Sequence, residues 1–322
     1  MSLSRKEMIE SAPSHRELFE KFSRSLDKGN KQTKQTYLKV LRNYINYLEE
    51  KRIEKPDDED VTAFKQYLRT ERNCHSATIQ LHNVVLKRFY QWCALREYYP
   101  DLSMDLEREK IEPTFVRREL SIEQANILLD NLSSKIDKGG IIALRDYTII
   151  FLILNIGLRT IEVSRANIED LRVENGMHVL YVQGKGHTEK DAPIRLENDV
   201  YGVIADYLEA RKNPKSGPLF INHGNRKKDD RIKTITISKL VKESLREIGI
   251  DSKIYTAHSL RHTCATIALL KGASLEEVQA LLRHKSINTT MIYLHTVTLL
   301  NNKSQTVVLA SLHKRAKKET KK

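Results

Sequence analysis

The chain has 322 residues, with 55 Lys and Arg against 42 Asp and Glu, a net charge of +13 and a pI near 9.5. That length accommodates two domains, because a single hydrophobic core usually stops growing below it. The positive excess favours a polyanionic partner, although charge alone does not distinguish DNA from RNA or an anionic membrane.

Hydrophobic patterning argues against a membrane protein or a secreted one. The longest apolar run, residues 147–156, is half the roughly 20 residues that a membrane span needs, so it predicts a buried core helix. The first ten residues lack the apolar core of a secretory signal, and we expect a cytoplasmic protein with no membrane partner. Cys74, Cys93 and Cys264 have no metal-binding or disulfide spacing and are expected to be ordinary thiols.

Two amphipathic helices are predicted in the first third, one starting near Lys31 and one near Ser76. Each begins with hydroxyl, amide and basic side chains, which suits a helix that enters a DNA groove or abuts phosphates. The alternative is a pair of bundle helices whose polar faces only meet solvent. The candidate DNA contacts are Lys31, Thr33, Lys34, Thr36, Ser76, Thr78, Gln80, Asn83 and Lys87.

Periodicity weakens after this helical domain, which we assign to residues 12–104. A linker follows over residues 105–117, and the second domain covers 118–300, opening with Ser121 as the N-cap of a helix and Gln124 at the capping-box position. The last segment, 301–322, combines apolar residues with a basic tail. It either docks on a neighbouring protomer or folds back on its own.

The second domain contains polar residues in unusual local settings. Arg159 follows Gly157 in a turn, and Glu162 lies three residues on, so the two share a helical face and form at least a structural ion pair. Lys185 sits between two glycines in a turn joining predicted strands at 178–183 and 192–196. A lysine there is either simply solvated or an ammonium delivered into a site by a flexible hairpin. The spacing does not match a P-loop.

A second group lies between residues 258 and 293. His258 and His262 have the spacing of a metal-binding pair, but no Glu occupies the H-E-x-x-H position and no third ligand is evident, so we expect no metal. Arg261 provides a planar fork for two phosphate oxygens. His284 follows an amphipathic helix capped by Ser274, and a tyrosine hydroxyl such as that of Tyr293 is a possible nucleophile.

Together these residues, in GLRTIE, GKG, HSLRH, LLRHKSINTT and MIYLH, resemble the tyrosine recombinase (phage integrase) family. The resemblance covers roughly residues 12–300. It implies a mainly α (α+β) protein: an N-terminal helical-bundle core-binding domain that clamps DNA, then a mostly helical catalytic domain with a small antiparallel sheet. It also implies a tetramer on two DNA duplexes.

The resemblance implies a role for each residue. Tyr293 would attack a DNA phosphodiester to give a 3′-phosphotyrosyl intermediate, which conserves the bond energy and requires no cofactor. Arg159 and Arg261 would bind the non-bridging oxygens, and Lys185 would protonate the leaving 5′-oxygen. His258 would handle the tyrosine's proton or position the phosphate.

Three further positions complete this implied site. His284 would donate a hydrogen bond to the phosphate, Glu162 would support the arginines, and His262 would give structural support. One residue departs from the family pattern, because Arg283 stands where the usual L-G-H motif has glycine. The expected activity is site-specific DNA strand exchange, for integration and excision of a mobile element or for dimer resolution. The rivals are a type IB topoisomerase-like relaxing enzyme and a catalytically silent DNA-binding regulator.

Overall fold

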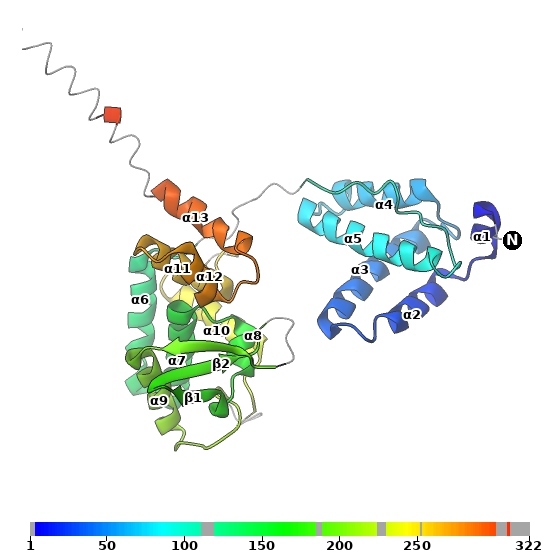
Figure 1. The fold of residues 1–322 in the computed structure, drawn as a ribbon. Coiled ribbons are helices and arrows are strands. Elements are labelled where there is room, and N and C mark those ends of the chain that lie inside the picture. Colours follow the sequence, from blue (N-terminus) through cyan, green and yellow to red (C-terminus); the bar gives the residue numbers. More distant parts are fainter. Residues whose placement is uncertain are drawn as a thin grey trace, which may run out of the picture. The chain divides into compact units, whose positions relative to one another are not determined.

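The computed structural model describes residues 4–110, 119–184, 189–223, 230–251, 253–300 and 308–309. The chain divides into two compact units, residues 1–114 and 115–322, each with its own hydrophobic core (Figure 1). The first is helical and the second is mostly helical with a three-stranded antiparallel sheet, which confirms the predicted fold class.

The described part of the first unit is a bundle of five helices. They are α1 (Arg5–Ser11), α2 (His15–Ser25), α3 (Lys31–Glu50), α4 (Asp58–Thr70) and α5 (Ser76–Ala94). Side-chain caps set four of the starts; at α3, Asn30 accepts from the first-turn N–H groups, and at α4, Asp57 forms a capping box. The core is aromatic, and at its centre the hydroxyl groups of Tyr44 and Tyr90 form a buried hydrogen bond of 2.8 Å.

A short segment, residues 106–110, runs back over this bundle after α5. Leu106 enters the core, and the carboxylate of Glu109 pairs with Lys65 at 2.8 Å and with Arg69 at 2.9 Å. The carbonyl of Glu107 accepts from the amide of Asn83 at 3.0 Å. We call residues 106–110 the strap, since these contacts bind it to α4 and α5.

The second unit surrounds one long apolar helix. Its elements are α6 (Ile122–Ser133), α7 (Ile136–Ile156), α8 (Thr160–Arg165), a 3-10 turn (Ile168–Asp170), β1 (Leu171–Glu174), β2 (Met177–Val182), β3 (Ala192–Leu196), α9 (Asn198–Ala210), α10 (Thr234–Glu247), α11 (Ala257–Leu270), α12 (Leu275–Leu282) and α13 (Asn288–Leu300). The strand order is β1-β2-β3. The structure adds β1 to the two predicted strands.

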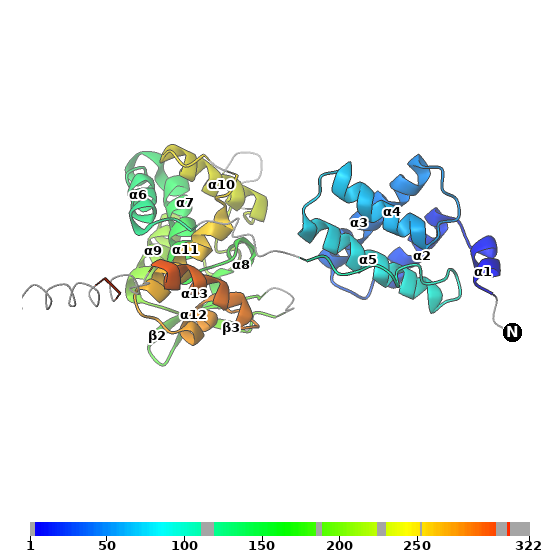
Figure 2. The same cartoon turned by 90° about the horizontal axis from the view of Figure 1, so that it is seen from above.

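Among the described residues, α7 alone is long and apolar enough to cross a membrane, which is weak support for such a role. Its side chains Ile149, Ile150, Leu152 and Ile153 are fully buried in the core of the second unit. The helix therefore serves as the core element predicted from the run at 147–156. It packs against α6, α9 and α11, and α11 in turn packs against α12 and α13 (Figure 2).

Candidate active site

A glycine turn at the end of α7 forms the floor of the candidate site. Gly157 terminates α7 in the left-handed conformation, with φ of 60° and ψ of 36°, and so directs the chain into α8. A Cβ atom there would come within 2.6 Å of Leu282 Cδ2. Two features therefore require glycine at position 157: the left-handed backbone conformation and the close approach of the end of α12.

Arg159 and Glu162 are joined across the first turn of α8. Arg159 is the N-cap; its backbone N–H donates to Glu162 Oε2 at 2.9 Å, and its Nη1 donates to Oε1 at 2.6 Å. The Glu162 side chain is fully buried, whereas that of Arg159 is 22% exposed. The predicted pair therefore exists, and it leaves part of the arginine open to a ligand.

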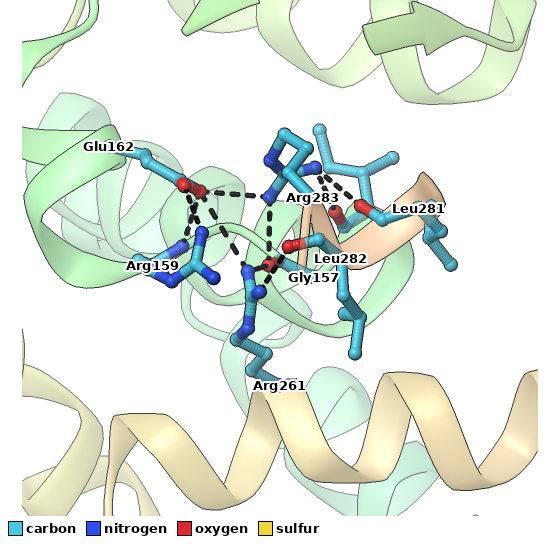
Figure 3. Close-up of polar contacts among 8 residues, drawn as sticks. Gly157, Arg159, Glu162, Arg261, Leu281, Leu282 and Arg283 are labelled. Atoms are coloured by element: carbon cyan, nitrogen blue, oxygen red, sulfur yellow. Dashed lines mark hydrogen bonds and ion pairs between the residues drawn. The ribbon is translucent and has the colours of Figure 1, made fainter. Parts of the chain in front are cut away.

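Arg261 projects from α11 toward the same carboxylate and is fully buried (Figure 3). Its Nη1 donates to the carbonyl of Gly157 and lies 3.8 Å from Glu162 Oε2, and its Nη2 donates to the carbonyl of Leu282. Among the described residues, its buried Nε has no hydrogen-bond acceptor. Such an unsatisfied donor is costly in the folded protein and is available to an incoming anion.

Arg283 supplies a third guanidinium, which the sequence analysis did not place in the site. Its Nη2 donates to Glu162 Oε2 at 2.8 Å and to the Gly157 carbonyl at 3.1 Å (Figure 3). Three arginines thus converge on one carboxylate, leaving two positive charges uncompensated. A cluster of arginines with this excess of positive charge is suited to binding phosphate.

The aromatic residues of the site lie on α11, α13 and the turn between α12 and α13. The ring of Tyr293 is 4% exposed and lies 5.0 Å from the ring of His262. It stacks on that of His284, with centroids 6.3 Å apart and planes at 10°. His258 packs edge-on against His262 at 4.5 Å, and Nδ1 of His284 is hydrogen-bonded to Thr290 Oγ1 at 2.9 Å.

Burial and charge shift the ionisation of these groups. Burial, together with the charges of Arg159 and Arg283, lowers the pKa of Arg261, while Glu162 and the Tyr293 phenol act on it in the opposite direction. Burial would raise the pKa of Glu162, but Arg283 and Arg159 hold it below its ordinary value. Burial and the nearby arginines lower the pKa of His284 to about 4. At neutral pH His284 is an uncharged hydrogen-bonding group.

The structure brings together seven of the eight residues assigned to the site from sequence. They are Arg159, Glu162, His258, Arg261, His262, His284 and Tyr293. Lys185 lies outside the described residues. The sequence analysis missed the Gly157 carbonyl, which accepts from two arginines, and Thr290, the partner of His284. A backbone carbonyl cannot be recognised as a hydrogen-bond acceptor from the sequence. The arginine that replaces the usual glycine at position 283 was the sequence feature that indicated additional contacts at this turn.

The candidate DNA contacts of the first unit fall into three groups. Lys31, Thr33, Ser76 and Thr78 are exposed at the starts of α3 and α5. Lys34, Thr36 and Lys87 are partly buried; Lys34 pairs with Asp27, and the Thr36 hydroxyl donates to the Gln32 carbonyl at 2.9 Å.

The strap engages the two remaining candidates. Gln80 Oε1 accepts from the Glu109 N–H at 2.8 Å, and Asn83 is only 2% exposed while it donates to Glu107. Gln80 and Asn83 could reach DNA only if these bonds to the strap broke. The interface prediction therefore rests on the exposed residues at the helix starts.

The chain belongs to the phage integrase family, whose model matches residues 118–298, and the model of the phage integrase N-terminal SAM-like domain matches residues 18–99. It is 31% identical over 254 residues to the tyrosine recombinase XerC of Caldanaerobacter subterraneus subsp. tengcongensis, covering 76% of this chain and 66% of that protein. It is 30% identical over 205 residues to XerA of Pyrococcus horikoshii, covering 64% and 67%. The chain thus spans about two thirds of the length of these relatives.

Solved structures share the fold at lower identity. XerH recombinase bound to a palindromic difH substrate, in a post-cleavage complex, superposes with a TM-score of 0.72 at 20% identity, covering 92% of this chain and 86% of that one. The Tn1549 transposon integrase in complex with transposon right-end DNA gives 0.65 at 16%, covering 87% and 94%. At these identities the likeness shows the fold.

Proposed function

We propose that this protein is a site-specific DNA recombinase that cleaves and rejoins strands through a tyrosyl phosphodiester. The observation that carries the proposal is the convergence of three guanidiniums on buried Glu162, with the Tyr293 ring packed against His262 and His284 of the same site. The arginine cluster supplies positive charge where a phosphate gains negative charge during displacement. Family membership and the XerC and XerA relatives support the same activity.

In the proposed reaction the Tyr293 oxygen attacks the scissile phosphorus and the bond to the 5′-oxygen breaks. This leaves a 3′-phosphotyrosyl ester and a free 5′-hydroxyl, so the bond energy is conserved and no nucleotide cofactor is consumed. Arg159 and the unsatisfied Nε of Arg261 bind the non-bridging oxygens. His258 receives the phenolic proton or orients the phosphate, and Lys185 protonates the leaving oxygen.

His284 acts in this scheme as a neutral hydrogen-bond donor. Its pKa of about 4 keeps the ring uncharged at neutral pH. When the Thr290 hydroxyl donates to Nδ1, the ring proton resides on Nε2 and is available to a phosphate oxygen. Glu162 and His262 support the arginines and the tyrosine, respectively.

The proposed assembly is a homotetramer on two duplexes, with the first unit contacting DNA through the exposed starts of α3 and α5. Strand exchange joins strands from two sites, and a tetramer on two duplexes would place two protomers on each duplex. Residues 301–322, most of which lie outside the described residues, either dock on a neighbouring protomer or fold back on their own chain. The net charge of +13 suits binding to duplex DNA, which should weaken steeply with salt.

The proposal is tested by trapping the covalent product. The protein is mixed with fragmented genomic DNA of the source organism, denatured in SDS and precipitated with potassium, and the attached DNA is sequenced. Enrichment of one short sequence class is expected. A nicked duplex of that sequence should then give a stable adduct with wild-type protein and none with Tyr293→Phe, which retains DNA binding. An adduct that persists in Tyr293→Phe would identify another nucleophile.

The same experiment separates the rival functions. A type IB topoisomerase-like enzyme would relax any supercoiled plasmid and give adducts without sequence enrichment. A silent DNA-binding regulator would bind a defined sequence and give no adduct. Enrichment together with an adduct would support the recombinase over both.

A further inference from the structure

Arg283 occupies a backbone position that favours glycine. It follows α12 in the left-handed conformation, with φ of 54° and ψ of 47°. This conformation is unfavourable for a residue with a Cβ atom and is usually filled by glycine at the end of a helix. The contacts of the arginine side chain offset this backbone cost.

The Arg283 side chain stabilises this conformation by donating hydrogen bonds to acceptors on three segments. Its Nη2 bonds to Glu162 on α8 and to the Gly157 carbonyl, and its Nη1 bonds to the carbonyls of Ile156 at the end of α7 and Leu281 in α12. The Arg283 side chain is only 10% exposed. Both terminal nitrogens are thus bonded to protein acceptors, which suits a role in holding neighbouring groups in place; the Nε of Arg283, like that of Arg261, has no acceptor among the described residues.

Arg283 shares its main acceptors with the two arginines proposed to bind phosphate. Glu162 Oε2 also accepts from the Arg159 N–H at 2.9 Å, and the Gly157 carbonyl also accepts from Arg261. Figure 3 shows the guanidiniums of Arg261 and Arg283 at these two acceptors, and the Arg159 guanidinium bonded to the other oxygen of the same carboxylate. A change at residue 283 must therefore alter the orientation of both Glu162 and the other arginines.

We propose that Arg283 is a positioning residue for strand cleavage. Acting through Glu162 and the Gly157 carbonyl, it fixes Arg159 and Arg261 in their phosphate-binding orientation. It also ties the end of α12, and with it the adjacent His284, to the end of α7. This inference rests on the proposed recombinase function.

The first test compares Arg283→Gly with Arg52→Gly on the nicked duplex found by covalent trapping. Arg52 is an exposed arginine of the first unit with a φ of 58°, so its replacement relieves the same kind of backbone cost away from the site. At saturating DNA, Arg283→Gly should lower the single-turnover cleavage rate at least tenfold and change the dissociation constant for DNA less than threefold. Arg52→Gly should leave both unchanged. Arg283→Lys, which keeps one charged donor, should recover part of the rate.

A double-mutant cycle with Glu162→Gln tests the route of action. If Arg283 acts through Glu162, the combined variant should lose no more than about threefold beyond the worse single variant. Fully multiplicative losses, or an Arg283→Gly rate equal to wild type, would overturn the inference. If circular dichroism shows that Arg283→Gly does not fold, the test rests on Arg283→Lys. A wild-type cleavage rate in Arg283→Lys would then overturn the proposed positioning role. A wild-type protein that forms no adduct removes the proposed function itself, and the inference with it.

Discussion

The close contact between Gly157 and Leu282 makes a quantitative prediction for Gly157→Ala. The left-handed backbone costs an alanine about 1–2 kcal/mol. A new Cβ 2.6 Å from Leu282 Cδ2 adds overpacking of roughly 1–3 kcal/mol. A smaller unfolded-state entropy offsets about 0.4–1 kcal/mol of this. The net expectation is a destabilisation of the second unit by roughly 2–4 kcal/mol, whichever denaturant is used.

Gly176→Ala is the matched control, because Gly176 has a φ of +76° in the β1–β2 turn and a Cβ atom added there would meet no neighbouring atom within 4 Å. Urea unfolding followed by far-UV circular dichroism reports both units, and the fluorescence of Trp92, the only tryptophan, reports the first unit. Gly157→Ala should lower the second-unit transition about 1–3 kcal/mol further than Gly176→Ala does. The fluorescence transition should not move. Equal shifts in the two variants would refute the steric argument.

Two further predictions concern pH and the strap. Between its ordinary pKa near 6.5 and about pH 4, His284 binds a proton in the unfolded chain but not in the folded protein, so the stability tied to this group is lost as pH falls through that window. Thermal melts of wild type and His284→Gln should therefore converge between pH 7 and pH 4.5. A constant difference between their melting temperatures would contradict the assigned pKa shift. Glu109→Gln weakens the charge-assisted bonds to Lys65 and Arg69 and should lower the Trp92-monitored unfolding free energy by about 1–3 kcal/mol, with no change in the second-unit transition. An unchanged Trp92 transition would mean that these ion pairs contribute no stability.

Periodic apolar patterns predicted most of the helices, because each buries one stripe against a core. Ser121 and Ser274 open their helices as predicted, since a capping box depends only on residues three apart. The strand β1 was missed: three of its four residues, Arg172, Val173 and Glu174, are exposed, so it lacks the alternation by which a half-buried strand is recognised.

Residues of the site could be predicted from the sequence where their chemistry depends on side chains a few positions apart. Arg159 and Glu162 are three residues apart, so their pairing follows from one helical turn. The contacts of Arg283 with Gly157 and Glu162 span more than 100 residues and depend on how α12 packs against α7. The burial of Asn83 could likewise not be predicted from the sequence, because the strap that covers it after α5 has no hydrophobic periodicity.

The strap also determines where the N-terminal unit can be cut for separate expression. A fragment stopping at Met104 would expose the apolar site left by Leu106 and remove the carboxylate between Lys65 and Arg69. Ending at Lys110 instead retains every described bond of the strap. The folded N-terminal unit thus extends several residues past its last helix. Measuring the solubility of a series of truncated fragments would locate its C-terminal boundary.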